Sequence, residues 1–335
     1  MANIVTFLIM VLIAFLACTE SYAQTKVVIA HAAMSPRVAP AWIAQDHRFF
    51  TKYGVNAEIV NIRTAPVMVA AIAAGEVQIG YTGGTAALGA AVGGTDLRIL
   101  ATWTNRVTYD LVARPEIKSP QDLRGKRFGV QSIGGTVWMG AILGLEHLGL
   151  EPVRDKIAIL VVGDQSVLTQ ALATRTIDAT VLDSSFSVTL QKKGFSVLAQ
   201  FSKVDIPFSS LGLVARKDYI DENPSLVESA LKAMLEGNAY ALSPKNKAST
   251  LASLERRLRL GNDEGKETAY NDMLTGLARK PYPSVAGLRN IQRLMAELNP
   301  KVAKIDIAQL NTDRFVRALD QSGFINKVLE SYGVR

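Results

Sequence analysis

Apolar positions in the first third of the chain alternate between two spacings. Short apolar runs, typical of buried strands, occupy residues 26–31, 54–60, 77–81 and 97–103. Between them, apolar residues recur at helical spacing over 38–50, 67–74 and 86–92. Strands that alternate with helices predict an α/β fold with a doubly wound, mostly parallel sheet. In such sheets ligands bind at the carboxyl ends of the strands, so the loops that follow the strands become the candidate site.

The same pattern resumes between Ser119 and Thr136. Arg127–Val130 suits a short strand, and the loop Ser132–Thr136 opens onto an apolar helical pattern that ends at Gly149. The first amides of a helix lack intrahelical partners and lie at its positive end, which favours an anionic group. The alternative is an ordinary strand–helix turn whose glycines serve only geometry.

A faint internal repeat links two parts of the chain. Residues 71–84 align with residues 171–184 at a constant offset, and in both segments a helix ends, a turn follows and a strand delivers a polar loop. The repeat predicts two similar lobes.

Two further strands bracket the second of these segments. Residues 109–113 and 209–216 both carry Leu-Val-Ala, followed in each case by an arginine, and would take the chain out of the first lobe and back. We therefore expect lobe 1 over 24–112, lobe 2 over 113–210, and a return to lobe 1 with a helical C-terminal third over 211–335. Two crossing strands form a hinge that permits closure around a ligand.

The N-terminal segment has the pattern of an export signal. An apolar run over 4–17 is too short to span a bilayer comfortably, and Ser21-Tyr22-Ala23 is a small-x-small cleavage pattern. Residues 1–23 are thus expected to be a signal peptide cleaved after Ala23, which places the mature chain in the periplasm. Lipid attachment at Cys18 is the alternative; this is the only cysteine, so the cleaved chain has no thiol.

Composition excludes several classes of function. The 335 residues carry a formal charge of +7, but Lys and Arg are scattered, without the aromatic-interleaved stripe of a nucleic-acid groove. The three histidines form no H-x-x-H motif, and no G-x-S-x-G motif is present. The sequence therefore predicts no catalytic residue, no metal, no cofactor and no nucleic-acid partner, and we expect a binding protein rather than an enzyme.

Several motifs, in this order and spacing, carry a resemblance to a known family. They are Gly75–Gly80, Asp122–Arg127, Leu148-Gly149-Leu150, Ala171-Leu172 with Ile177-Asp178-Ala179, and Ser322–Ile325. The chain resembles the periplasmic solute-binding proteins of ABC importers, in the branch of nitrate, sulfonate, taurine and pyrimidine-precursor binders. One departure is Thr174-Arg175-Thr176, where the family places a glycine turn.

The resemblance implies a two-lobed, type II-like periplasmic-binding-protein fold that captures a solute between its lobes. A monomer that works with an ABC permease and its ATPase is expected. Two alternatives stay open: a ligand-sensing module for a membrane receptor, and a binder of pyrimidine precursors.

The candidate ligand contacts all lie in loops at strand ends. Those from lobe 1 are Ser35, Arg63, Thr64, Thr82, Gly83, Gly84, Thr85 and Trp103, and those from lobe 2 are Ser132, Gly134, Gly135, Thr136, Asp164 and Asp183. The planar guanidinium of Arg63 would hold an oxyanion, so the predicted solute is a small organic anion such as a sulfonate or carboxylate. Two alternatives stay open: Arg63 is a solvated surface residue, and Trp103 is a core residue.

Overall fold

The computed structural model describes residues 26–32, 34–62, 64–260 and 263–334. The predicted signal peptide, Cys18 and Arg63 lie outside the described residues. No helix among the described residues is both long enough and apolar enough to cross a membrane.

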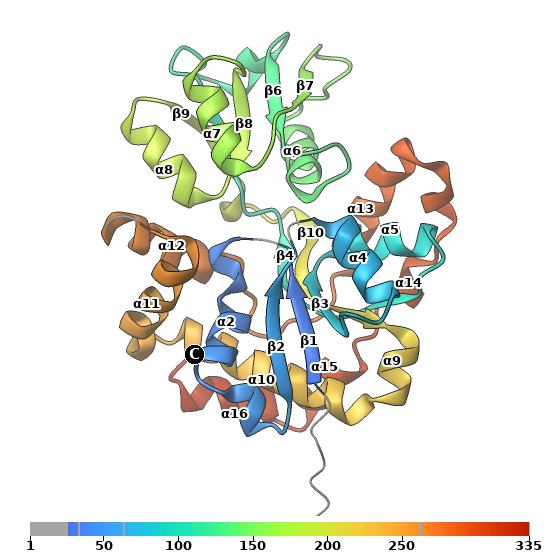
Figure 1. The fold of residues 1–335 in the computed structure, drawn as a ribbon. Helices are drawn as coiled ribbons and strands as arrows, with labels where there is room; N and C mark the ends of the chain where they lie inside the picture. The colour runs from blue at the N-terminus through green and yellow to red at the C-terminus, as the bar shows by residue number, and fades with distance from the viewer. Residues whose placement is uncertain (1–25, 33, 63, 261–262, 335) are drawn as a thin grey trace, which may run out of the picture.

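The described chain forms two lobes, each built on a five-stranded sheet (Figure 1). The sheet of lobe 1 has the order β2-β1-β3-β10-β4, and that of lobe 2 has the order β7-β6-β8-β5-β9. The strands of lobe 1 are β1 (Lys26–His31), β2 (Asn56–Asn61), β3 (Ile79–Thr82), β4 (Leu97–Arg106) and β10 (Pro207–Arg216). Those of lobe 2 are β5 (Asp110–Ala113), β6 (Arg127–Val130), β7 (Ala158–Val161), β8 (Ala179–Leu182) and β9 (Ser196–Gln200).

Each sheet is parallel except for the strand that crosses between the lobes. β10 runs antiparallel to β3 and β4, and β5 runs antiparallel to β8 and β9. The doubly wound α/β fold with crossing strands is therefore confirmed. Both crossings lie slightly earlier in the chain than the predicted boundaries: all of β5 belongs to the second sheet, and all of β10 to the first.

Helices cover both sheets. In the first half of lobe 1 they are η1 (Pro36–Val38), α2 (Ala39–Asp46), α3 (Phe49–Lys52), α4 (Ala65–Ala73) and α5 (Gly84–Val92). Lobe 2 has η2 (Pro120–Leu123), α6 (Thr136–His147), α7 (Gln165–Ala173), α8 (Ser184–Lys192) and η3 (Phe201–Lys203).

The chain after β10 is helical, as predicted. It forms α9 (Lys217–Glu222), α10 (Pro224–Leu242), η4 (Pro244–Asn246), α11 (Lys247–Leu258), α12 (Asp263–Gly276), α13 (Val285–Leu298), η5 (Pro300–Lys304), α14 (Ile307–Leu310), α15 (Arg314–Gln321) and α16 (Phe324–Ser331). α10 packs along α2 on lobe 1, whereas α12 and α13 also reach lobe 2, at α8 and α6 (Figure 1). The C-terminal third thus supports both lobes.

The internal repeat is a repeat of structure. β3 and β8 are the middle strands of their sheets, and the helices that flank them, α4 with α5 and α7 with α8, begin and end at equivalent residues. The side chain of Gln78 accepts a hydrogen bond from Val28 N, at 2.8 Å, and Asp178 accepts one from Arg127 N at the same distance. In each lobe a side chain just before the middle strand, Gln78 before β3 and Asp178 before β8, thus links that strand to its neighbour, β1 or β6.

The turns before the two middle strands are also equivalent. Gly75 has a φ of 80°, and Arg175 holds the matching position with a φ of 63°. The departure from the glycine pattern at 174–176 therefore leaves the turn in place, with an arginine in the left-handed region that favours glycine.

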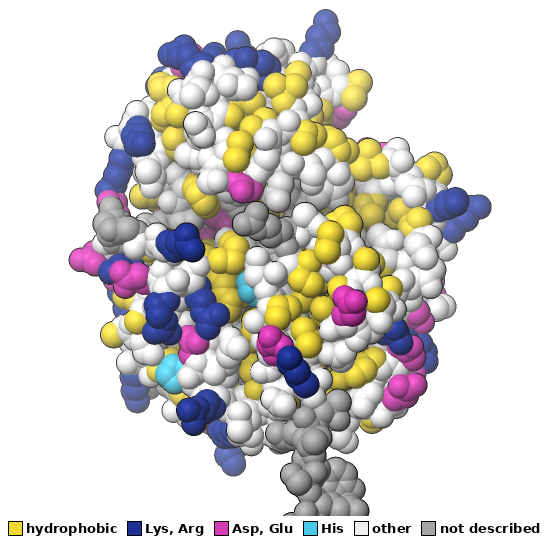
Figure 2. Space-filling view, in the orientation of Figure 1, with side chains coloured by type: hydrophobic (Ala, Val, Ile, Leu, Met, Phe, Trp, Pro, Cys, Tyr) yellow, Lys and Arg dark blue, Asp and Glu magenta, His cyan; other side chains and the backbone are white. Residues whose placement is uncertain are grey.

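Charged groups are distributed over both lobes. Lys and Arg side chains are visible on each lobe of the face drawn in Figure 2, together with Asp and Glu. Two exposed ion pairs join the C-terminal helices to lobe 2: Lys192 on α8 with Glu264 on α12, and Arg293 on α13 with Glu146 on α6. Exposed pairs of this kind contribute little free energy.

Candidate functional site

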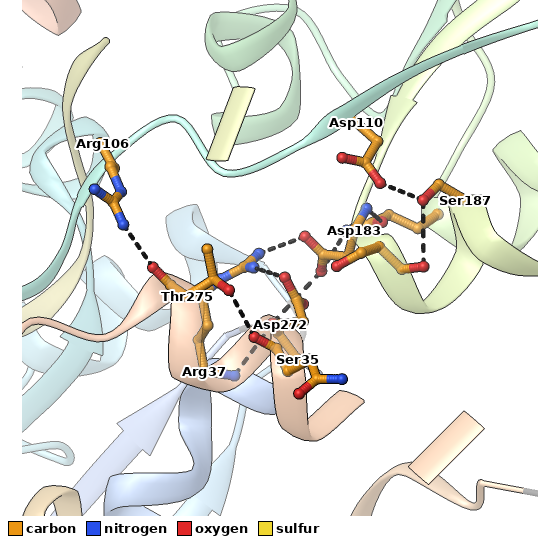
Figure 3. Close-up of polar contacts among 11 residues, drawn as sticks. Ser35, Arg37, Arg106, Asp110, Asp183, Ser187, Asp272 and Thr275 are labelled. Atoms are coloured by element: carbon orange, nitrogen blue, oxygen red, sulfur yellow. Dashed lines mark hydrogen bonds and ion pairs between the residues drawn. The ribbon is translucent and has the colours of Figure 1, made fainter. Parts of the chain in front are cut away.

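A buried ion pair joins the two lobes at the carboxyl ends of their strands. Arg37 lies in η1, directly after β1, and its Nη2 atom donates to Asp183 Oδ1 at the start of α8 (Figure 3). Both side chains are buried. Since Arg37 belongs to lobe 1 and Asp183 to lobe 2, the contact shows that the carboxyl ends of the strands in the two sheets face each other.

A second carboxylate reaches the same guanidinium from the C-terminal third. Arg37 Nη1 donates to Asp272 Oδ1 on α12 at 2.9 Å. The stem of Arg37 passes over Gly276, where a Cβ atom would stand 2.5 Å from Arg37 Cδ. A glycine at the end of α12 therefore makes room for the arginine. The guanidinium also lies 5.9 Å from the ring centroid of Tyr109.

Asp183 is held by groups from both lobes. Its backbone N–H donates to Gln165 Oε1 at 2.6 Å, and Gln165 Nε2 donates to Asp183 Oδ2 at 3.0 Å. Ser35 Oγ of lobe 1 donates to the same oxygen at 3.4 Å. This network fixes the orientation of the carboxylate, because each of its oxygens has a directed donor.

Burial and mutual repulsion change the titration of this cluster. Burial, partly opposed by Arg37 and reinforced by Asp183, raises the pKa of Asp272 to about 7. Burial also raises the pKa of Asp110, against the hydrogen bond donated by Ser187. Burial lowers the pKa of Arg37, but the attraction of Asp183 and Asp272 outweighs it, so the net shift is upward and the guanidinium stays charged.

Two of the fourteen predicted contact residues meet in this cluster: Ser35 and Asp183. Residues that the sequence analysis missed complete it, namely Arg37, Tyr109, Asp110, Gln165, Ser187 and Asp272. A signal for Arg37 was present, because it interrupts an apolar segment directly after β1. Asp272 stands beside Met273 on the buried side of an amphipathic helix, which is an unusual place for a carboxylate.

Other predicted contacts have structural roles in the described chain. Asp164 caps α7, accepting hydrogen bonds from Ser166 N at 3.0 Å and Val167 N at 3.1 Å. Gly83 approaches the backbone of β10 so closely that a Cβ would stand 2.1 Å from Ser210 O. A Cβ on Gly84 would stand 2.7 Å from a methyl group of Leu288 on α13. Packing against β10 and α13 explains both glycines.

Trp103 lies in the core of lobe 1. Its side chain is fully buried and contacts Tyr81 edge to face, with ring centroids 5.7 Å apart. Trp103 is therefore a core residue, the second of the two expectations, and does not end its strand. β4 continues past it to Arg106, which leaves Trp103 inside the sheet.

The remaining predicted contact residues also lie near strand ends. The hydrogen bonds of the described residues do not connect them to the cluster. Thr82 is buried at the end of β3 and Thr85 is half-buried in α5, whereas Thr64 is exposed before α4. In lobe 2, Ser132 is exposed, and Gly134, Gly135 and Thr136 are half-buried at the start of α6. Among the described residues, no group of three His, Cys, Asp or Glu side chains is placed to hold a metal ion.

Sequence comparison finds relatives that are described as binding proteins. The chain is 27% identical over 203 residues to a protein of Brucella abortus (strain 2308) named only as a candidate binding protein, a match that covers 59% of this chain and 61% of the relative's length. It is 26% identical over 227 residues to the taurine-binding periplasmic protein of Escherichia coli (strain K12), covering 66% of this chain and 69% of the relative.

Solved structures share the fold over most of the chain. The periplasmic aliphatic sulphonate binding protein SsuA from Escherichia coli superposes with a TM-score of 0.70 at 18% identity, over 86% of this chain and 92% of that one. The model of the NMT1/THI5-like family matches residues 35–248, which include Arg37, Asp183 and, of the strands described above, all except β1. Since that match covers more than half of the sequence, the chain belongs to the NMT1/THI5-like family.

Proposed function

We propose that this protein captures a small solute between its two lobes and delivers it to an ABC-type membrane importer. One observation carries the proposal: Arg37, Asp183 and Asp272 bring directed, buried polar groups from three segments together where the lobes meet. A ligand that contacts both lobes stabilises their closed arrangement, and closure is the state that a membrane partner can recognise.

The names of the relatives support this role. Two of them are described as binding taurine and aliphatic sulphonates, and both are called periplasmic. For this chain we infer the same compartment, with export followed by cleavage after Ala23. Mass spectrometry of the mature protein tests the cleavage: an N-terminus at Gln24 supports it, and a diacylated Cys18 contradicts it.

A thermal-shift screen of residues 24–335 tests solute binding. The panel holds sulfonates, carboxylates, nitrate, pyrimidines and amines. A solute that binds only the folded state at a hundred times its dissociation constant adds about 2.7 kcal/mol to the free energy of unfolding, which raises the melting temperature measurably. No rise with any class would contradict the proposal. Uptake of the identified solute into vesicles that carry the permease then tests delivery, with protein-free vesicles as the control.

A further inference from the structure

The charges at the lobe junction do not balance. Arg37 is the one cation within the cluster's described hydrogen-bond network, and it faces the buried carboxyl groups of Asp183 and Asp272. A third buried carboxyl, Asp110, lies on β5 and raises the pKa of Asp272 by repulsion. Lys203, an exposed residue of η3, is the further cation that acts on Asp110. Buried negative charge without a counter-ion is costly, so these carboxyl groups resist ionisation, and a cation brought to the junction stabilises their ionised forms.

One carboxylate oxygen is unused. Asp272 is 4% exposed, its Oδ1 atom accepts from Arg37, and its Oδ2 atom is buried without a hydrogen-bond partner among the described residues. The hydroxyl of Ser184 is near enough to lower the pKa of this carboxyl, yet it leaves Oδ2 without a hydrogen bond of acceptable geometry. When Asp272 is ionised, Oδ2 accepts hydrogen bonds and donates none, so a group that completes the site around this form is a donor.

Apolar side chains line the same sheet edges. Five large hydrophobic residues at or near the carboxyl ends of β1, β2, β6 and β7 are exposed: Met34, Val67, Ile133, Val161 and Val167. Figure 2 shows hydrophobic side chains on both lobes beside their junction. Since the Arg37–Asp183 contact shows that these edges face each other, a solute held between them would meet apolar groups as well as the charged cluster.

We propose that the solute carries a protonated nitrogen, and that Asp272 Oδ2, supported by Asp183, is the acceptor that recognises it. The proposal rests on the proposed function and names the chemical class of its solute. The nitrogen donates to Oδ2 and supplies the missing positive charge, while the carbon part of the solute lies against the apolar residues at the strand ends. An anionic group elsewhere in the solute is compatible with this arrangement, but an anion without a basic nitrogen is not.

Matched pairs of compounds test the requirement for nitrogen. Isothermal titration calorimetry of residues 24–335 compares taurine with isethionate, in which a hydroxyl replaces the ammonium group, and pentylamine with 1-pentanol. We expect the ammonium compound of at least one pair to bind at least tenfold more tightly than its partner. Isethionate, or a simple alkanesulfonate, binding as tightly as any amine would overturn the proposal and leave solute capture intact. Absence of binding by every class in the wider screen would instead count against capture itself.

Two substitutions on one helix test the assigned acceptor. Asp272→Asn removes the charge and retains the shape, and Asp263→Asn makes the same change at an exposed position of α12. We expect Asp272→Asn to weaken binding of the ammonium compound at least tenfold and Asp263→Asn to leave it unchanged. Equal affinity of the Asp272→Asn and unaltered proteins would contradict the assignment. If Asp272→Asn fails to fold, as judged by its circular dichroism, Asp183→Asn provides the second variant with the same expected loss.

Discussion

Arg37 and Asp183 lie 146 positions apart in the sequence and form a buried ion pair that links the two lobes. The pair brings the loop after β1 against the start of α8, and Asp272 from α12 binds the other side of the guanidinium.

Replacing Arg37 by Met should reduce the free energy of unfolding by about 3 kcal/mol, because it leaves buried carboxyl groups without their cation. Urea denaturation measures the change. Arg289→Ala is the control, since Arg289 is exposed on α13 and should cost less than about 0.5 kcal/mol. Equal stabilities of the two variants would show that the pair adds nothing to the fold.

The repeated turn gives a prediction of opposite sign. Arg175 has a φ of 63° at the position that Gly75 holds in lobe 1, so Arg175→Gly should stabilise the protein by about 0.5–1 kcal/mol. Its ion pair with Glu116, at 3.3 Å, is exposed and contributes little. The reciprocal change, Gly75→Arg, should destabilise by about 1 kcal/mol. Thermal unfolding of both variants is the measurement, and a loss of stability in Arg175→Gly would refute the strain argument.

Two glycines near α5 should respond differently to the same added methyl group. At Gly83 a Cβ would stand 2.1 Å from Ser210 O, whereas at Gly89 no heavy atom lies within 4 Å. Gly83→Ala should therefore cost about 2 kcal/mol or more, through displacement of β10 from the start of α5. Gly89→Ala, inside the helix, should gain about 0.5–1 kcal/mol. Denaturant titration of the two variants separates these results, and similar effects at both positions would exclude the packing role of Gly83.

The titration of Asp272 predicts a pH dependence of stability. Burial raises its pKa in the folded protein to about 7, above the ordinary value of 3.8, so the folded state binds this proton more tightly than the unfolded state does. Its contribution to stability is therefore greatest below pH 4 and is lost as the pH rises to about 7. Unfolding free energies at pH 5.5 and 7.5 should differ less in Asp272→Asn than in the unaltered protein. An identical difference would show that Asp272 does not titrate in this range.

The same carboxyl should make the binding of an ammonium solute depend on pH. Arg37, Asp183, Asp110 and Tyr109 act on Asp272 from the elements packed around it, and ionised Asp272 is the form that accepts a cation. The affinity should increase between pH 6 and pH 8 for a solute that stays protonated throughout. Calorimetry at the two pH values measures it, and a decrease would show that the solute binds the protonated carboxyl.

The alternation of strand and helix patterns was sufficient to predict an α/β fold with mostly parallel sheets, because both spacings arise from backbone geometry that every segment obeys locally. The two lobes were predicted from the internal repeat and from the family resemblance. The repeat was visible because β3 and β8 occupy equivalent places in their sheets. The predicted lobe boundaries were less accurate at the two crossings. The first residues of β5 were assigned to lobe 1 and those of β10 to lobe 2, but β5 belongs to the sheet of lobe 2 and β10 to that of lobe 1. No local sequence pattern records which distant strand a segment pairs with.

Two residues of the cluster at the lobe junction were among the predicted ligand contacts, and their contact with a solute stays a prediction. Ser35 and Asp183 stand at strand ends, where topology places ligands. Arg37 and Asp272 could not be paired from the sequence, because their contact joins η1 to a helix more than two hundred residues later. Gly83 and Gly84 were predicted to be ligand contacts, but close contacts with β10 and α13 already account for the absence of side chains there.

Capture of the solute between the two lobes should change the distance between them, and a distance measurement tests this most directly. Ala70 on α4 and Gln170 on α7 are exposed at equivalent positions of the two lobes, and the cleaved chain has no cysteine of its own. Spin labels attached to both cysteines of the Ala70→Cys, Gln170→Cys double variant report the distance between the lobes by pulsed electron paramagnetic resonance. Saturation with the solute that gives the largest thermal shift should narrow the distance distribution and move it to shorter values. An unchanged distribution at saturation would contradict capture by the two lobes.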